Sequence, residues 1–223
     1  MSVSPTHRFA ILLDGALSPT ARLRSQLAGC RVLAADGGIR HADRLGLDPE
    51  LWLGDFDSAD GPLAKRFGHV PRKDYTTEKA ISDGQIAIRH ALDAGAREIV
   101  LAGALGGERS DHAFFNLAAA ADLARNRPDV SVLLSSGCEE AVPLLPGKAF
   151  RPDWPAGTVF SVVSFSAMKG LTVRNAKWPL DDVEVPFGST WTLSNVAGEG
   201  LEILLSDGCG VAICQLECLS DPV

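Results

Sequence analysis

The sequence has no apolar run long enough to cross a membrane, and its first eight residues lack the basic start and long apolar core of a signal peptide. Basic residues are also few: 21 Lys and Arg stand against 28 Asp and Glu, which gives a net charge of −7. This balance argues against a general nucleic-acid or membrane-surface binder, although a local basic pocket for phosphates remains compatible with it. We therefore expect a globular cytoplasmic protein.

Clustered metal-binding residues are missing as well. The cysteines show no paired zinc-type spacing and have no histidines clustered beside them, so we expect reduced and mostly buried thiols. They are Cys30, Cys138, Cys209, Cys214 and Cys218. The chain contains no internal repeat or low-complexity tract, and its 223 residues suffice for one large domain or two small ones.

The chain changes character partway along, which predicts two domains. Up to about residue 135, strand-like apolar runs alternate with helix-like segments, as is typical of a parallel sheet with helices on both faces. Such a sheet binds its ligands at the carboxyl ends of its strands. The predicted strands are 9–13, 31–35, 98–102 and 130–134, and the predicted helices are 19–28, 38–45, 82–94 and 111–126.

The second part is rich in Gly and Pro and favours β structure. Short β-favouring runs separated by turns predict a small antiparallel sandwich or barrel. These runs are 158–165, 190–193, 201–205 and 210–216. We therefore predict an α/β fold, with a doubly wound, mostly parallel sheet in residues 1–142 and an antiparallel β domain in 143–223. The stretch 143–155 would connect them.

Two carboxylates, Asp55 and Asp57, follow the apolar run 51–53. In an extended segment alternate side chains point the same way, so both would face one site. Oxygen ligands favour Mg²⁺ or Ca²⁺ over zinc, and Mg²⁺ held by carboxylates often also holds a phosphate. By itself the pattern is weakly specific, because a polar turn that caps a helix has the same sequence. Phosphatases of the haloacid dehalogenase type and nucleotide-sugar transferases also use such a pair.

Two further segments follow predicted strands. After 31–35, Gly37 and Gly38 would let the backbone approach a ligand while Asp36 supplies an acceptor or metal ligand; a helix-capping aspartate after a tight turn is an equally good interpretation. After 98–102, a glycine-rich loop runs into a helix N-terminus, which suits polyphosphate. In that loop Arg109 can make bidentate contacts with phosphate oxygens, which favours a phosphate loop over a simple turn.

Taken together, the segments resemble those of thiamine pyrophosphokinases. That family carries, in order, the motifs A-D-G-G, G-D-x-D-S, D-x-T-D, G-G-R-x-D-H, G-L-K-[YW]-x-L and S-x-S-N. The matching segments here are 35–38, 54–58, a variant at 82–84, 106–112, 176–180 and 192–195. Because the motifs occur in the same order over nearly the whole chain, the resemblance is far more specific than any single motif.

The resemblance implies transfer of a pyrophosphoryl group from ATP to the hydroxyl of thiamine, which gives thiamine diphosphate and AMP. It implies Mg²⁺ held by Asp55, Asp57 and Asp83. Arg109 would stabilise the polyphosphate, and Asp111 would orient that arginine or assist the hydroxyl. The implied nucleotide-binding residues are Asp36, Gly37, Gly38, Gly106, Gly107, Arg109 and His112.

The resemblance further implies a homodimer with a shared active site, in which thiamine lies between the nucleotide domain of one subunit and the β domain of the other. Thiamine is cationic and flat, so an aromatic face suits it. The candidate thiamine-binding residues are Trp178, Thr192, Ser194 and Asn195. The other tryptophans, Trp52, Trp154 and Trp191, are assigned to packing.

The third motif departs from the family pattern. Alignment on 79–84 makes Asp83 the metal carboxylate and puts Ala80 where the family has an aspartate, whereas alignment on 73–77 would use Asp74 instead. Further departures are Asp14 for Asn, Ile39-Arg40 for Ala-Asn and an extra Glu108. Ala80 keeps open a non-catalytic thiamine or nucleotide sensor. A metal-dependent phosphatase with Asp55 as nucleophile is a second alternative, although it gives the glycine-rich loop no role.

Overall fold

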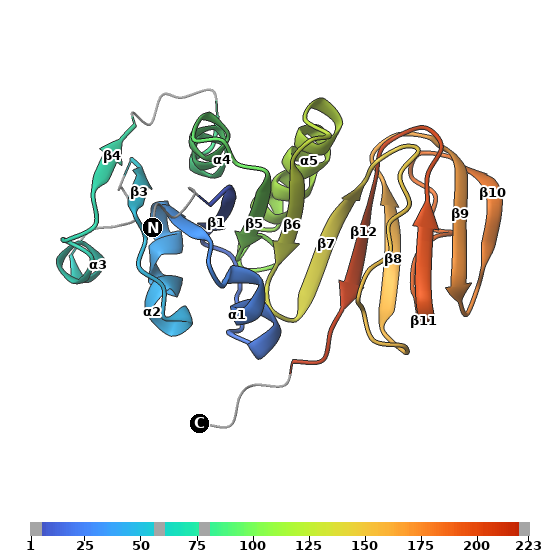
Figure 1. The fold of residues 1–223 in the computed structure, drawn as a ribbon, viewed down its shortest axis with the longest axis horizontal. Helices are drawn as coiled ribbons and strands as arrows, with labels where there is room; N and C mark the ends of the chain where they lie inside the picture. Colours follow the sequence, from blue (N-terminus) through green and yellow to red (C-terminus); the bar gives the residue numbers. More distant parts are fainter. Residues whose placement is uncertain (1–5, 56–60, 76–80, 219–223) are drawn as a thin grey trace, which may run out of the picture.

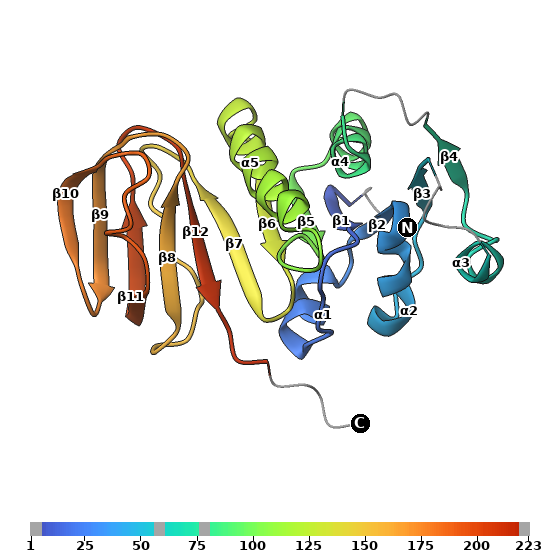
Figure 2. The same cartoon turned by 180° about the vertical axis from the view of Figure 1, so that it is seen from behind.

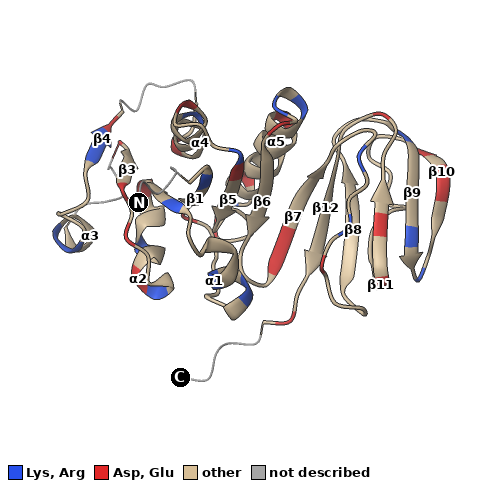
Figure 3. Ribbon diagram, viewed as in Figure 1, with Lys and Arg blue, Asp and Glu red and all other residues tan. Residues whose placement is uncertain are grey.

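The computed structural model describes residues 6–55, 61–75 and 81–218. In these residues one continuous sheet of 12 strands runs from end to end, in the order β10-β9-β11-β8-β12-β7-β6-β5-β1-β2-β3-β4 (Figure 1). None of the described helices is both long and apolar enough to cross a bilayer. Acidic and basic residues alternate over both halves without a continuous basic stripe, as Figure 3 shows.

The N-terminal half of the sheet is parallel, as predicted. Its strands are β1 (Arg8–Leu12), β2 (Arg31–Ala35), β3 (Leu51–Gly54), β4 (Arg72–Asp74), β5 (Glu98–Ala102) and β6 (Ser131–Ser135). Between them lie α1 (Ala21–Leu27), the 3₁₀ helix η1 (Asp36–Arg40), α2 (His41–Leu45), α3 (Pro62–Arg66), α4 (Asp83–Asp93) and α5 (Ser110–Asn126). All the strands and helices predicted for this half are present, with boundaries that shift by up to three residues, whereas β3, β4 and α3 were not among the predicted elements.

Helices cover both faces of the parallel sheet because its inner strands are apolar on both sides. In β1, Phe9 and Ile11 belong to the core that includes α4 and α5, whereas Ala10 and Leu12 belong to the core that includes α1 and α2. Figures 1 and 2 show the same arrangement from opposite sides, with α4 and α5 on one face and α1 and α2 on the other. The predicted doubly wound arrangement is confirmed.

The second half is antiparallel and has its own apolar core, which includes Phe160, Leu171 and Ile203. Its strands are β7 (Glu139–Leu144), β8 (Val159–Ser164), β9 (Met168–Ala176), β10 (Leu180–Val185), β11 (Asn195–Leu204) and β12 (Gly210–Gln215). The strand predicted at 190–193 is wrong, because those residues form turns and bends before β11. Threonines alternate there with larger apolar residues as in a strand, and the N–H of Val162 in β8 donates to the carbonyl of Thr192 at 2.9 Å, but the ladder with β8 begins only at Asn195.

Strand β7 joins the two halves into one sheet. It pairs with β6 on one side and with β12 on the other, both antiparallel. Pro143 and Leu144 belong to this strand, so the connection expected to begin at 143 starts after Leu144. The predicted domain boundary between residues 142 and 143 therefore falls within a continuous strand, and the division into two domains stays a prediction.

Two cysteines form a disulfide, contrary to the expectation that all five are reduced. Cys138, in the turn between β6 and β7, is joined to Cys218 just beyond β12, with their Cα atoms 5.1 Å apart. The backbone prepares this contact, because the N–H of Leu216 donates to the carbonyl of Cys138 at 2.7 Å. Since 80 positions separate the two cysteines, spacing in the sequence gave no sign of the pair.

Candidate active site

The strand order reverses between β1 and β5, and at such a point an open parallel sheet forms a crevice. From β1 the chain proceeds outward through β2, β3 and β4 and then returns to pair β5 with the other edge of β1. In an open parallel sheet, ligands bind at the carboxyl ends of the strands where the order reverses in this way. The register puts Leu12 opposite both Ala34 and Ala102, so the loops that follow these strands start side by side.

The loops after β1 and β5 contact each other through their backbones. The N–H of Gly15 donates to the carbonyl of Gly103 at 3.0 Å. A Cβ at Gly15 would lie 2.4 Å from that carbonyl oxygen, and one at Gly107 would lie 3.1 Å from the backbone nitrogen of Ala16. Gly106 and Gly107 also have positive φ values of 69° and 104°, which favour glycine. The loop predicted to bind phosphate therefore lies at the crevice.

The end of β2 lies against the same crevice. Asp36 adopts a left-handed backbone conformation with φ 43°, and its carbonyl accepts a hydrogen bond from the Trp52 indole at 2.8 Å. A Cβ at Gly38 would lie 2.2 Å from the carbonyl oxygen of Leu12, so only glycine allows η1 to approach β1 so closely. Thus the Asp36 and Gly38 segment packs against the end of β1 and forms a second wall of the candidate site, while its role in binding stays a prediction.

Sequence reasoning missed three neighbours of this wall as site residues. Arg40 makes a two-contact ion pair with Asp14, its Nε 2.8 Å from Oδ1 and its Nη2 3.0 Å from Oδ2. His41 is 6% exposed, and its Nε2–H donates to the carbonyl of Gly15 at 3.0 Å. Burial lowers the pKa of His41 below its usual range. The sequence did contain a signal for this ion pair, because residues 14 and 40 both depart from the family motifs and carry opposite charges.

The acidic candidates gather at the neighbouring strand ends. Asp55 follows Gly54, where a Cβ would lie 3.3 Å from the Cα of Asp36, so the backbones of the two segments are in close contact. Asp74 is paired with Gly54 in the ladder between β3 and β4. Thus Asp36, Asp55 and Asp74 belong to one edge of the sheet.

Asp83 approaches the same edge from a helix. Ser82 and Gln85 form a capping box that starts α4 at Asp83, in agreement with the helix predicted at 82–94. A Cβ at Gly84 would lie 3.1 Å from the side chain of Leu13, just past the end of β1. Among the residues that the structure describes, no group of three or more His, Cys, Asp and Glu is placed to hold a metal ion. Asp57 and Ala80 lie outside the described residues.

Arg109 and Asp111 form an ion pair at the start of α5. The Nε of Arg109 lies 3.0 Å from Oδ1 of Asp111, and its Nη2 lies 2.7 Å from Oδ2. This contact lowers the pKa of Asp111 to about 2. Both side chains are more than half exposed, and His112 beside them is exposed too. The ion pair with Asp111 holds the planar guanidinium of Arg109 in one orientation and leaves it exposed to solvent.

The candidate residues of the β domain divide into buried and exposed groups. Asn195 is 8% exposed, and its side chain both accepts from the N–H of Trp178 at 3.1 Å and donates to the carbonyl of Trp178 at 2.7 Å. The Thr192 hydroxyl, also buried, donates to the carbonyl of Val162 at 2.6 Å. Ser194 adopts φ 59°. Trp178 is 53% exposed, and the buried amide of Asn195 holds its backbone through these two hydrogen bonds.

The tryptophans assigned to packing behave differently from one another. Trp52 and Trp154 are buried, as predicted, but Trp191 is 58% exposed, so its assignment to packing is wrong within the described chain. Its neighbour Leu193 is exposed as well, because the turn before β11 carries both away from the core. In Figure 1, β9, β10 and β11 lie at the opposite end of the molecule from β1 to β4. One chain therefore does not bring Trp178 to the acidic edge.

The fold consists of a parallel α/β part, with a glycine-rich loop at the carboxyl ends of its strands, followed by an antiparallel β part. Residues 27–132 match the model for the thiamin pyrophosphokinase catalytic domain, and residues 150–209 match the model for the thiamin pyrophosphokinase vitamin B1 binding domain. The chain belongs to the thiamin pyrophosphokinase family. The kinase activity predicted from the ordered motifs is the activity of that family.

Solved structures agree with the family. A thiamin pyrophosphokinase from Geobacillus thermodenitrificans is 25% identical with a TM-score of 0.77, and the match covers 96% of this chain and 100% of that one. The enzyme from Bacillus subtilis is 20% identical with a TM-score of 0.80 over 94% and 99% of the two chains. That from Candida albicans is 14% identical with a TM-score of 0.76 over 97% and 96%. No curated protein sequence matches the chain.

Proposed function

We propose that the protein binds ATP at the crevice between β1 and β5 and transfers its terminal pyrophosphoryl group to thiamine. The thiamine hydroxyl oxygen attacks the β-phosphorus of ATP. The bond from that phosphorus to the bridging oxygen breaks, and AMP leaves with the bridging oxygen. The hydroxyl proton passes to solvent or to a nearby carboxylate. The products are thiamine diphosphate and AMP.

The observation that carries this proposal is the backbone contact between Gly15 and Gly103 at the point where the strand order reverses. It places the glycine-rich loop beside the loop after β1, and β1 is followed across the sheet by β2 and β3, the strands that lead to Asp36 and Asp55. A polyphosphate needs backbone N–H groups and cations around it, and the loop that enters α5 supplies both. We infer that the phosphates lie over Gly106 and Gly107 and that Gly37 and Gly38 leave room for the nucleotide.

The carboxylates fit Mg²⁺. Their oxygen atoms are the hard ligands that this ion prefers, and Asp36 and Asp55 lie at adjacent strand ends. We assign the ion to Asp55, Asp57 and Asp83. When bound, Mg²⁺ neutralises negative charge on the phosphate oxygens.

Arg109 is the side chain of the protein that stabilises the negative charge on the transferred group. Its fork can contact the transferred group while Asp111 fixes the orientation of the guanidinium through their ion pair. With a pKa of about 2, Asp111 is ionised at neutral pH and serves as an orienting anion. Positioning and electrostatics then supply most of the catalysis, as is common in phosphoryl transfer.

We further propose that two copies of the chain share each active site. Within one chain Trp178 lies at the opposite end from the acidic edge, so a second copy is needed to bring thiamine to ATP. Large apolar side chains are exposed on both halves, and they could form the contact between copies. These residues are Phe114, Phe115, Trp178, Phe187, Trp191 and Leu193.

The reaction is tested by its products. Purified protein with ATP, Mg²⁺ and thiamine should give AMP and thiamine diphosphate in equal amounts, resolved by chromatography. Formation of ADP, or hydrolysis of ATP that ignores thiamine, would contradict the assignment. Binding of thiamine without any product would favour the sensor alternative.

The metal assignment is tested with Asp57→Asn. This variant should lose nearly all turnover while it keeps its thermal unfolding profile. Asp48→Asn is the matched control, because its exposed carboxylate precedes β3 at the opposite end of the strand. Retained activity in Asp57→Asn would mean that this carboxylate is structural.

A further inference from the structure

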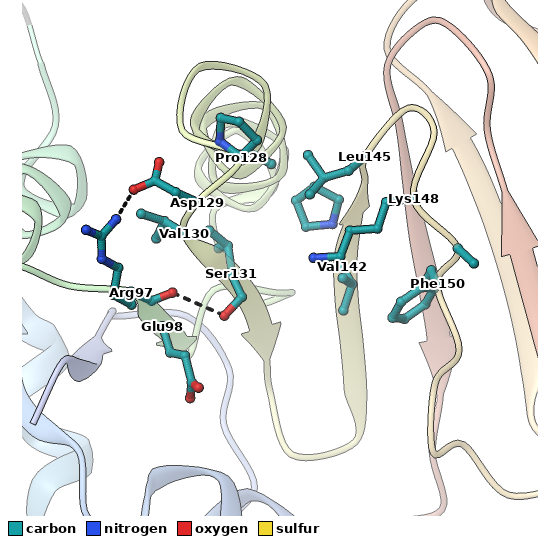
Figure 4. Close-up of a pocket in the computed structure, with 14 residues that line it drawn as sticks. Arg97, Glu98, Pro128, Asp129, Val130, Ser131, Val142, Leu145, Lys148 and Phe150 are labelled. Atoms are coloured by element: carbon teal, nitrogen blue, oxygen red, sulfur yellow. Dashed lines mark hydrogen bonds and ion pairs between the residues drawn. The ribbon is translucent and has the colours of Figure 1, made fainter.

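A pocket of about 380 Å³ lies between the two halves of the molecule, away from the candidate active site (Figure 4). It is bounded by the starts of β5 and β6, the end of α5, the second half of β7 and the connection that follows β7. Its volume lies in the range of small-molecule sites in proteins, about 300 to 1,000 Å³. The pocket is therefore large enough for a compact organic ligand.

The pocket and the active site occupy opposite edges of the sheet. Glu98, the first residue of β5, lines the pocket, whereas the glycine-rich loop follows Ala102, the last residue of that strand. At about 3.3 Å per residue, β5 separates them by about 13 Å. A ligand in this pocket would thus leave the glycine-rich loop uncovered.

Most of the lining is apolar. Val130 and Val132 come from the β6 side and Val142 from β7, while Leu145 and Phe150 come from the connection. Phe150 is fixed in place by the β domain, because its backbone N–H donates to the carbonyl of Ile203 at 2.8 Å. These walls favour an aliphatic or aromatic body.

Among the charged side chains that line the pocket, all but one form ion pairs within the described part of the chain. Arg97 pairs with Asp129, and Glu98 pairs with Arg8 at 2.7 Å. Lys148 has no ion-pair partner in the described part of the chain, and Figure 4 shows its side chain turned toward the pocket between β6 and β7. A lysine is a compact point charge that attracts an anionic group without demanding one geometry.

We propose that this pocket is a second small-molecule site, which binds a compact apolar molecule bearing a single carboxylate. The apolar body lies against Val130, Val142 and Phe150, and the carboxylate faces the ammonium of Lys148. The site is independent of the proposed reaction, since none of these residues belongs to the candidate active site.

The test uses 4-phenylbutyrate and its neutral analogue 4-phenylbutanamide as probes, with the full-length protein and titration calorimetry. The carboxylate should bind saturably with one site per chain, and the amide should bind several-fold more weakly. Binding of the carboxylate should be unchanged when thiamine and a non-hydrolysable ATP analogue with Mg²⁺ are present. Absence of saturable binding, equal binding of the amide, or competition by thiamine and nucleotide would each overturn the proposal.

Variants locate the site. Lys148→Met keeps the apolar stem and removes the charge, so it should weaken carboxylate binding several-fold and leave amide binding unchanged. Lys169→Met is the matched control, because Lys169 is also exposed but lies on β9 outside the lining. Ala149→Phe places a ring in the pocket and should abolish binding of both probes. Undiminished carboxylate binding in Lys148→Met would overturn the assignment even if Ala149→Phe failed to fold.

Discussion

Arg22 of α1 and Glu140 of β7 form a two-contact ion pair, with Nε donating to Oε1 at 2.5 Å and Nη2 donating to Oε2 at 3.0 Å. Glu140 is 2% exposed and also accepts hydrogen bonds from the Gln26 amide and the Trp154 indole. The contact raises the pKa of Arg22 above its usual value. The ion pair thus links α1, the helix that follows β1, to β7, the strand that joins the two halves of the sheet.

Removal of this buried carboxylate should destabilise the fold. Glu140→Ala leaves the Arg22 charge and the Trp154 indole without their partner, so the free energy of unfolding should fall by about 3 kcal/mol. Asp153→Ala is the control, because Asp153 pairs with the same arginine but has an 82% exposed side chain; its loss should cost about 1 kcal/mol or less. Urea denaturation measures both. Equal losses in the two variants would contradict the importance of burial.

Contact between the two glycine loops should be sensitive to a single methyl group. In Gly15→Ala the added carbon would meet the Gly103 carbonyl, so the loops must separate and kcat/KM should fall by about 100-fold. Gly29→Ala is the control, since a Cβ there meets nothing within 4 Å and only the left-handed backbone costs about 1 kcal/mol. Steady-state kinetics with ATP varied checks the difference. Normal activity in Gly15→Ala would refute the site.

Stability should fall as the solution is acidified below the usual pKa of histidine. Burial lowers the pKa of His41, so the unfolded chain binds a proton more readily than the folded one. Below about pH 6.5 this group should reduce the free energy of unfolding by up to about 1.4 kcal/mol per pH unit, until the folded pKa is reached. Urea denaturation between pH 7.5 and 5 should show a smaller slope for His41→Gln.

The control for that slope is His69→Gln, which removes an exposed imidazole whose side chain is 64% accessible. Its pH slope should match that of the unmodified protein. A His41→Gln variant with an unchanged slope would show that His41 does not dominate the acid limb.

Two arginines offer a matched comparison of catalytic role. Arg109 with Asp111 and Arg127 with Asp129 make the same pair two residues apart, both exposed. Of the two, only Arg109 belongs to the glycine-rich loop proposed to bind phosphate, so Arg109→Ala should lower kcat by about 100-fold and Arg127→Ala should leave it unchanged. Single-turnover assays check this. Similar kinetics in the two variants would remove Arg109 from the mechanism.

The pH dependence of activity should not come from Asp111. Its pKa is lowered to about 2 by Arg109, so the ion pair favours the folded form above about pH 4 and is lost only as the pH falls toward 2. The pH profiles of kcat between 5 and 9 should therefore have the same shape in Asp111→Asn as in the unmodified protein, at a lower amplitude. A shifted acid limb in the variant would contradict this.

The disulfide can be detected by counting the free thiols of the unfolded protein. Without reductant, the unfolded protein should show three reactive thiols, from Cys30, Cys209 and Cys214, and after reduction it should show five. Since the bridge closes a separation of 80 residues, its loss in Cys138→Ser should cost up to about 4.5 kcal/mol on the chain-entropy model. Cys30→Ser is the control. Five thiols before reduction would mean that the pair is open.

Local patterns predicted much of the parallel half because its inner strands are apolar on both faces and because α1 and α4 begin at side-chain caps. A few neighbouring residues suffice to predict the local structure at three places: the strand of Phe9 to Leu12, the helix start at Ser82 and Gln85, and the loop of Gly106 and Gly107. The rule that ligands bind at the carboxyl ends of parallel strands then predicts, from the sequence alone, that Asp36 and Asp55 lie at the same edge of the sheet. Roles for the site residues stay predictions.

The features that escaped prediction depend on contacts between distant segments. Pairing of β7 with β12 brings together Ala141 and Ile213, and no local pattern specifies that register. Cys138 meets Cys218 only because of this pairing. Trp191 is exposed because a turn carries it outward, and hydrophobicity alone cannot distinguish a core ring from a surface one.

The uninterrupted hydrogen-bond ladder through β7 has a mechanical consequence. A rigid-body swing of one half against the other would have to break the pairing of β7 with β6 or with β12, and would also strain the Arg22 link below it. The molecule therefore has no hinge at this junction. Substrates must then enter and leave by rearrangement of loops, so the rate of product release should be insensitive to changes that loosen the linker after β7.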